Sequence, residues 1–205
     1  MDISEIKNLI TKGANTLKIK KWDFGASFSN DFSVQVDKGE PKQLKASQKQ
    51  IMTLRVWNSQ NLVGITTTSD LSEDGLLKAL HQANIASNYG NKNEHTNFSP
   101  LSKEPIQKQD SQINTPSGIR KLLKILRNAE HKLLNTNQAI KSVPYNGLSE
   151  SFFKRIYANS DGAIRSYENS QAALYLYARA EEANKKPRSS GSVKLGYVVD
   201  DIDVE

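Results

Sequence analysis

Apolar residues recur along the chain at two different spacings, and these spacings separate a few helices from a larger number of strands. Repeats at three and four residues are typical of a helix with one buried face. They predict three helices, over about 3–20, from about Asp70 to Tyr89, and from Thr115 to about Leu133. Alternation with a period of two is typical of a half-buried strand. It predicts strands over 24–28 and 32–36, 51–57, 62–68, 150–159, 164–183 and 192–201, and a polar strand is predicted over 41–47.

The order of these elements favours one class of fold. Helices and strands come in separate groups instead of alternating strictly, which indicates α+β architecture with a largely antiparallel or mixed sheet and about three helices. The segment 37–40 is predicted to be a turn, because Gly39 tolerates the positive φ that tight turns require. We expect a single α+β domain over 1–205, since neither half alone contains a complete core.

Local signals indicate where two of the helices begin. Asp70 or Ser72 can cap the second helix, and Glu73 completes a capping-box pattern with Asp70. Thr115 can cap the third helix, with Pro116 at its first position. No glycine-rich loop separates the predicted strand 62–68 from the helix that follows it. We therefore interpret this junction as structural and not as a phosphate-binding site.

Residues 90–116 lack any apolar period and are rich in Asn, Gln, Ser and Pro. A segment of this length and composition is predicted to be a long surface loop. It is expected to be the first site of proteolytic cleavage, at lysines such as Lys92, Lys103 or Lys108.

The composition excludes several classes of protein. The mean hydropathy is −0.61, and no apolar run approaches the ~20 residues that a membrane-spanning helix requires. The chain contains no cysteine, which excludes disulfides, thiol catalysis and cysteine-ligated zinc. The first residues form an amphipathic helix with acidic residues and do not resemble a signal peptide. A cytoplasmic protein without a membrane segment is the interpretation that fits.

The formal net charge of +6 makes nucleic acid a possible partner. The basic residues are scattered, however, and no recognisable nucleic-acid motif accompanies them, so binding of nucleic acid is unlikely on the sequence. A basic helix face carries four of these residues, Arg120, Lys121, Lys124 and Arg127, and solvated helix faces commonly look the same.

The sequence shows no catalytic constellation. His81, His95 and His131 are far apart, and no pair has the spacing that a helical metal site requires. No serine lies in a nucleophile elbow, and the carboxylates are dispersed. We therefore predict no catalytic residue, no metal ligand and no cofactor in this chain.

One strand face carries residue types that are common at binding surfaces. Leu174, Leu176, Ala178 and Ala180 form the side that we expect to pack on helices. Tyr175, Tyr177 and Arg179 form the opposite side, and tyrosine and arginine are enriched at interfaces. We predict an interaction face there. A solvated strand with amphipathic tyrosines is the alternative.

Two stretches, 34–90 and 157–183, together resemble the N-terminal region of the TldD/PmbA family, also called modulators of DNA gyrase. The order of several short motifs carries the resemblance, although each motif alone is weak. They are Lys38-Gly39-Glu40, Arg55-Val56, Gly64 followed by Ile65-Thr66-Thr67-Thr68, Ser69-Asp70-Leu71-Ser72, Asn159-Ser160-Asp161-Gly162 with Tyr167, and Ala180-Glu181-Glu182. The Thr-Ser-Asp-Leu-Ser element is closer to the PmbA (TldE) branch.

This resemblance implies a scaffold that forms part of a cavity in a TldD–TldE-type metalloprotease complex, with peptides as substrates. It implies a TldD-type subunit as partner, with a homo-oligomer as the alternative, and zinc in the TldD-type partner. The family's His-Glu-x-x-x-His motif is absent here, so no catalytic residue is carried over and the chain alone is expected to be inactive. The length fits an N-terminal domain without the family's C-terminal domain, either excised or truncated. A module that binds DNA or gyrase is the alternative function.

Overall fold

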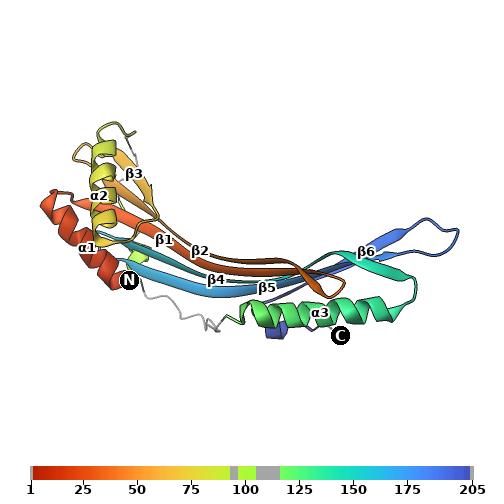
Figure 1. The fold of residues 1–205 in the computed structure, drawn as a ribbon. Coiled ribbons are helices and arrows are strands. Elements are labelled where there is room, and N and C mark those ends of the chain that lie inside the picture. Colours follow the sequence, from red (N-terminus) through yellow and green to blue (C-terminus); the bar gives the residue numbers. More distant parts are fainter. Residues whose placement is uncertain (1, 93–96, 105–115, 204–205) are drawn as a thin grey trace. The chain divides into compact units, whose positions relative to one another are not determined.

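A computed structural model describes residues 2–92, 97–104 and 116–203 (Figure 1). In this part of the chain, three α-helices accompany a six-stranded sheet with the strand order β3-β2-β1-β4-β5-β6. The elements are α1 (Ile3–Thr16), β1 (Lys21–Asp37), β2 (Glu40–Trp57), β3 (Val63–Thr68), α2 (Glu73–Ser87), α3 (Gly118–Thr136), β4 (Ile140–Asn159), β5 (Ile164–Ala180) and β6 (Arg188–Gly196), with short 3₁₀ helices at Pro100–Lys103 and Val199–Asp201. The predicted α+β class with about three helices is confirmed.

The contacts divide the chain into two compact units, each assembled from three segments. Unit 1 comprises Met1–Phe28, Lys49–Asp110 and Lys154–Tyr167. Unit 2 comprises Ser29–Gln48, Ser111–Phe153 and Glu168–Glu205. Strands β1, β2, β4 and β5 each contribute residues to both units. The single domain expected from the sequence stays a prediction, and the units are described separately below.

In unit 1, helices α1 and α2 pack on one face of the sheet. Alternate residues of the strands, such as Phe24 and Leu54, are fully buried together with Ile6 and Ile10 of α1 and Leu80 of α2. The two helices pack closely, because a β-carbon at Gly13 of α1 would lie 2.6 Å from the side chain of Leu77. Asp2 and Glu5 form a capping box at the start of α1.

In unit 2, helix α3 packs on the sheet through Leu122 and Leu126, which are fully buried. They contact a cluster formed by strand residues and by the segment after β6, namely Val34, Val36, Leu148, Ala172, Leu174, Val199 and Ile202. The turn predicted at 37–40 joins β1 to β2, with positive φ at Lys38 and Gly39. The buried carboxylate of Glu130 on α3 accepts the backbone N–H of both turn residues, at 3.1 and 2.7 Å.

Three strand predictions differ from the structure. The predicted strands 41–47 and 51–57 are one strand, β2. The sequence does not indicate this continuity, because residues 40–51 are exposed throughout and carry no apolar alternation. Strand β4 begins ten residues earlier than predicted, at Ile140. There Asn146 is buried, and its side-chain amide accepts the N–H of Val36 and donates to the C=O of Val36. Strand β6 spans Arg188–Gly196 and not 192–201.

The helix starts also differ in detail. Ser72 caps α2 by accepting the N–H of Gly75 at 3.2 Å, whereas Asp70 accepts the N–H of Ser72, so the capping box with Asp70 is wrong. Helix α3 begins at Gly118, after Pro116. The buried carboxylate of Glu150 accepts the N–H of Ser117 at 2.9 Å and satisfies the helix start instead of a local cap. Thr115 lies outside the described residues, as do 93–96 and 105–115 of the predicted loop 90–116.

Candidate functional site

The predicted interaction face lies on β5 in unit 2, on the side opposite the core. Leu174 is buried against the cluster under α3, as expected, and Leu176 packs against it. The antiparallel register with β6 places Tyr175 opposite Val193, Tyr177 opposite Gly191 and Arg179 opposite Ser189. Directly opposed residues of an antiparallel pair share one face of the sheet. The tyrosine row is therefore continuous with the side chains of β6.

Each tyrosine covers a glycine of a neighbouring strand. A β-carbon at Gly147 of β4 would lie 2.5 Å from the ring of Tyr175, and one at Gly191 would lie 2.4 Å from the ring of Tyr177. The hydroxyl of Tyr175 accepts a hydrogen bond from the side-chain amide of Gln35, at 2.8 Å. Tyr175 is thus fixed within the sheet, whereas Tyr177 keeps 41% of its surface exposed.

The sequence analysis missed two residues of this face. Val193 and Leu195 of β6 are 54% and 67% exposed, and Leu195 pairs with Ala173. The alternation of Val193, Lys194 and Leu195 signals a strand, but only the register with β5 assigns the two apolar residues to this face. At the other end of the row, Arg179 Nε lies 2.8 Å from a carboxylate oxygen of Glu181. We call Tyr175, Tyr177, Val193 and Leu195 the tyrosine face.

A polar cluster lies on the sheet in unit 1. Asp23 is buried, and Arg55 binds its carboxylate with Nε at 2.8 Å and with Nη2. The hydroxyl of Tyr157 donates to the same carboxylate at 3.3 Å. The hydrogen bond to Asp23 raises the pKa of Arg55, and burial raises the pKa of Tyr157. Because every group is engaged within the cluster, its chemistry is that of an internal ion pair.

Aromatic rings lie beside this pair. The Arg55 guanidinium lies 5.4 Å from the ring centre of Trp57, and the ammonium group of Lys21 lies 5.1 Å from the same ring and 4.8 Å from that of Phe98. Phe98 contacts Trp57 edge to face, with ring centres 5.5 Å apart. The contacts of Phe98 with Lys21 and Trp57 hold the segment before the 3₁₀ helix Pro100–Lys103 against β1 and β2.

No metal site is found in the described part of the chain, where no three His, Cys, Asp or Glu side chains converge. The ring of His131 hydrogen-bonds with the side chain of Asn135 at 3.1 Å, and His81 lies exposed on α2. His95 lies outside the described residues.

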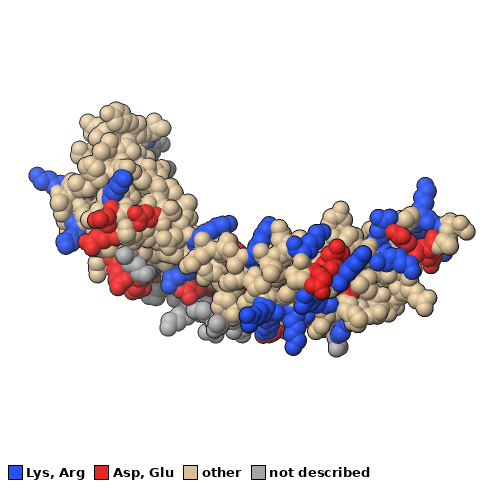
Figure 2. All heavy atoms as spheres, in the orientation of Figure 1, with Lys and Arg blue, Asp and Glu red and all other residues tan. Residues whose placement is uncertain are grey.

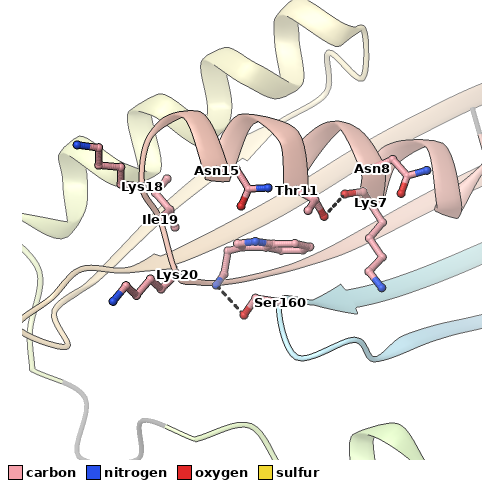
Figure 3. A pocket seen from close by; sticks show the side chains of 9 residues that line it. Lys7, Asn8, Thr11, Asn15, Lys18, Ile19, Lys20 and Ser160 are labelled. Atoms are coloured by element: carbon pink, nitrogen blue, oxygen red, sulfur yellow. Dashed lines mark hydrogen bonds between the residues drawn. The ribbon is translucent and has the colours of Figure 1, made fainter.

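Unit 1 contains a cavity of about 750 Å³ beside α1 (Figure 3). Its lining includes lysines, asparagines, Thr11, Trp22 and Ser160, but no carboxylate. Ser160 belongs to one of the motifs behind the family resemblance, and its hydroxyl oxygen accepts the N–H of Trp22 at 3.3 Å. In Figure 3, Lys7 and Lys20 extend from different ends of the cavity. The cavity lacks a paired acid and base, and so it shows no catalytic arrangement.

The basic face of α3 is partly neutralised. Lys121 pairs with Asp200 at 2.7 Å, and Arg127 lies 3.6 Å from Glu40. Figure 2 shows acidic side chains interspersed among the basic ones that gather near this helix. This distribution is unlike the continuous basic surface that binds a nucleic-acid backbone. Among the described residues, no helix is both long and apolar enough to cross a membrane.

The class of protein that these observations define is an α+β domain with an exposed aromatic sheet face and no reactive centre among its described residues. Residues 112–205 match a family model described as the PmbA/TldA metallopeptidase central domain. This segment includes α3, β6 and the tyrosine face. The resemblance predicted an N-terminal domain, whereas the family model assigns this segment to a central one. Comparison with curated proteins found no match.

Solved structures share the fold over almost the whole chain. A candidate modulator of a DNA gyrase from Thermotoga maritima is 16% identical with a TM-score of 0.73, covering 99% of this chain and 45% of that one. TldE from Thermococcus kodakarensis is 14% identical with a TM-score of 0.76, covering 94% and 43%. A candidate modulator of DNA gyrase from Bacteroides thetaiotaomicron is 13% identical with a TM-score of 0.76, covering 98% and 47%. The chain spans less than half the length of each.

Proposed function

We propose that this chain is a scaffold domain of a PmbA (TldE)-like subunit in a TldD–TldE-type metallopeptidase complex. The match of residues 112–205 to the family's central domain carries the proposal. The fold shared with TldE from Thermococcus kodakarensis supports it. The domain contributes no catalytic group of its own, and its role is to hold a TldD-type partner and help wall the space in which peptides are cleaved. Such a complex works in the cytoplasm.

The tyrosine face is the surface that we assign to assembly. Exposed aromatic and apolar side chains in one row are typical of interface anchors. Tyr177 and Val193 are exposed and are not part of the buried core, so we expect their removal to leave the fold intact. Tyr175 is less suitable for a first test, because its hydroxyl also bonds Gln35 within the sheet.

Co-purification with the TldD-type subunit of the same genome tests the proposal. Tyr177→Ala combined with Val193→Ser is expected to weaken association at least about tenfold, which corresponds to about 1.4 kcal/mol. Tyr89→Ala is the matched control, because this tyrosine is 88% exposed and lies in unit 1. Unchanged association of a folded double variant would remove the tyrosine face from the assembly. Absence of any complex with the unmodified chain would refute the proposed function, and a self-associated chain would indicate the homo-oligomer instead.

A further inference from the structure

Strand β6 has one open edge. The sheet order ends at β6, and its pairing with β5 runs from Ala172↔Gly196 to Ala180↔Arg188. Within the described residues, no strand pairs with its other side, and all residues of 188–195 are exposed. Such an edge presents unpaired backbone N–H and C=O groups, which can accept another strand.

The two faces of β6 differ in chemistry. Val193 and Leu195 lie on the tyrosine face, opposite Tyr175 and Ala173. Arg188 and Lys194 alternate with them and lie on the other face, opposite Ala180 and Leu174. A strand added to this edge would meet apolar side chains on one face and positive charges on the other.

The segment that contains β6 carries only basic charges. Residues 183–196 contain Lys185, Lys186, Arg188 and Lys194 and no acidic residue. Lys185 pairs with Glu182, and Lys194 donates to the backbone carbonyl of Asp203. Arg188 and Lys194 therefore provide the positive charge that lies along the edge itself.

We propose that the open edge of β6 binds an extended polypeptide segment in which apolar and acidic residues alternate. The backbone of the segment bonds the free N–H and C=O groups of β6, as in other cases of strand addition. Its apolar side chains lie beside Val193 and Leu195, and its carboxylates face Arg188 and Lys194. This inference goes beyond the proposed function, because it requires no TldD-type subunit and no cleavage of the segment.

A second copy of the chain fits this edge poorly. Symmetric antiparallel pairing of two β6 strands about Gly191 would place Arg188 of each copy opposite Lys194 of the other. Like charges directly opposite each other destabilise a strand pair. The charge thus favours an acidic segment over self-association.

The probe is a fluorescently labelled octapeptide of alternating valine and glutamate, and anisotropy measures its binding to the full chain. An octapeptide of alternating valine and lysine should bind at least about tenfold more weakly, which corresponds to about 1.4 kcal/mol. Two N-methylated forms of the first peptide separate strand addition from side-chain contact. Because alternate residues of a strand direct their N–H groups to one side, methylating only one of the two residue types should abolish binding.

Charge reversal on the protein completes the test. Arg188→Glu combined with Lys194→Glu should weaken binding of the glutamate peptide at least about tenfold and strengthen binding of the lysine peptide. The control Lys12→Glu, on the exposed surface of α1, should change the binding of neither peptide. Equal binding of both N-methylated peptides would overturn the proposal. So would the absence of binding at concentrations up to about 1 mM, where a Kd of that size corresponds to about −4.1 kcal/mol. Self-association that competes with the peptide would show that a second copy takes the edge, which would overturn it as well.

Discussion

Removing the carboxylate of Asp23 should destabilise unit 1 through the groups that it leaves behind. Asp23 is 1% exposed and accepts hydrogen bonds from Arg55 and Tyr157. In Asp23→Asn, one oxygen can still accept a bond, but the new amide N–H₂ faces donors. Hydrogen bonds to charged groups contribute about 1.5–3 kcal/mol each. Because the Arg55 side chain is 45% exposed and water can solvate it in part, we expect a total loss of about 2 kcal/mol.

A double-mutant cycle distinguishes this cause from general disruption of the core. Asp23→Leu alone leaves Arg55 without its partner, Arg55→Met alone leaves the buried Asp23 without its partner, and the two substitutions together remove both charges. Replacing both partners of a buried pair by apolar groups is often close to neutral. We therefore expect the double variant to be more stable than Asp23→Leu, with a coupling energy of about 2 kcal/mol.

Urea unfolding followed by tryptophan fluorescence measures these values. Both tryptophans of the chain, Trp22 and Trp57, lie in unit 1, and Trp57 is next to Arg55, so the signal reports on the unit that carries the change. The free energy of unfolding is extrapolated to zero urea, and the slope m is compared among the variants to check that they unfold in the same way. If the two single substitutions add to the double within about 0.5 kcal/mol, the ion pair does not stabilise unit 1 in the way described.

Three further outcomes are expected. Gly64→Ala should cost about 2 kcal/mol in urea unfolding, because its β-carbon would lie 2.0 Å from a backbone oxygen of Ala83, whereas Gly25→Ala, with 4.0 Å to its nearest neighbour, should cost far less. The raised pKa of Tyr157 means that the folded state keeps a proton that the unfolded chain loses, so stability falls as the pH rises above about 10. The free energy of unfolding of Tyr157→Phe should fall less steeply with pH over that range. An identical pH dependence in the two proteins would contradict the role of Tyr157. Elemental analysis after dialysis should find well under one zinc per chain, and a retained equivalent would show a site outside the described donors.

The motifs behind the family resemblance can now be explained by geometry. Gly39 provides the positive φ of the turn between β1 and β2. Gly64 allows β3 to lie close to α2, and Ser72 caps the start of that helix. Asn159 accepts the backbone N–H groups of Asp161 and Ala163 in the turn between β4 and β5. These positions hold the architecture, which explains why they indicated the fold and carried no chemistry.

The parts that could not be predicted depend on contacts distant in sequence. Glu150 satisfies the start of α3 from 33 residues away, and the buried amide of Asn146 is satisfied by Val36, 110 residues away. Period-two patterning cannot show that the predicted strands 41–47 and 51–57 are continuous, because the residues between them are exposed on both faces. It also does not reveal the early part of β4 around Pro144. The tyrosine row of β5 was predicted from its alternation, but Val193 and Leu195 joined it only through the register with β6.

The division of unit 1 among three separate segments affects how it can form during synthesis. Its core includes Ile156 and Ala158 from the last of these segments, alongside residues of α1 and β1. A nascent chain that has emerged only as far as Asp110 lacks this part of the core. At about 5–20 residues per second, translation from there to Tyr167 takes roughly 3–11 s. During that interval the apolar faces of α1 and α2 remain without their complete cover, and a chaperone that binds nascent chains would find them accessible.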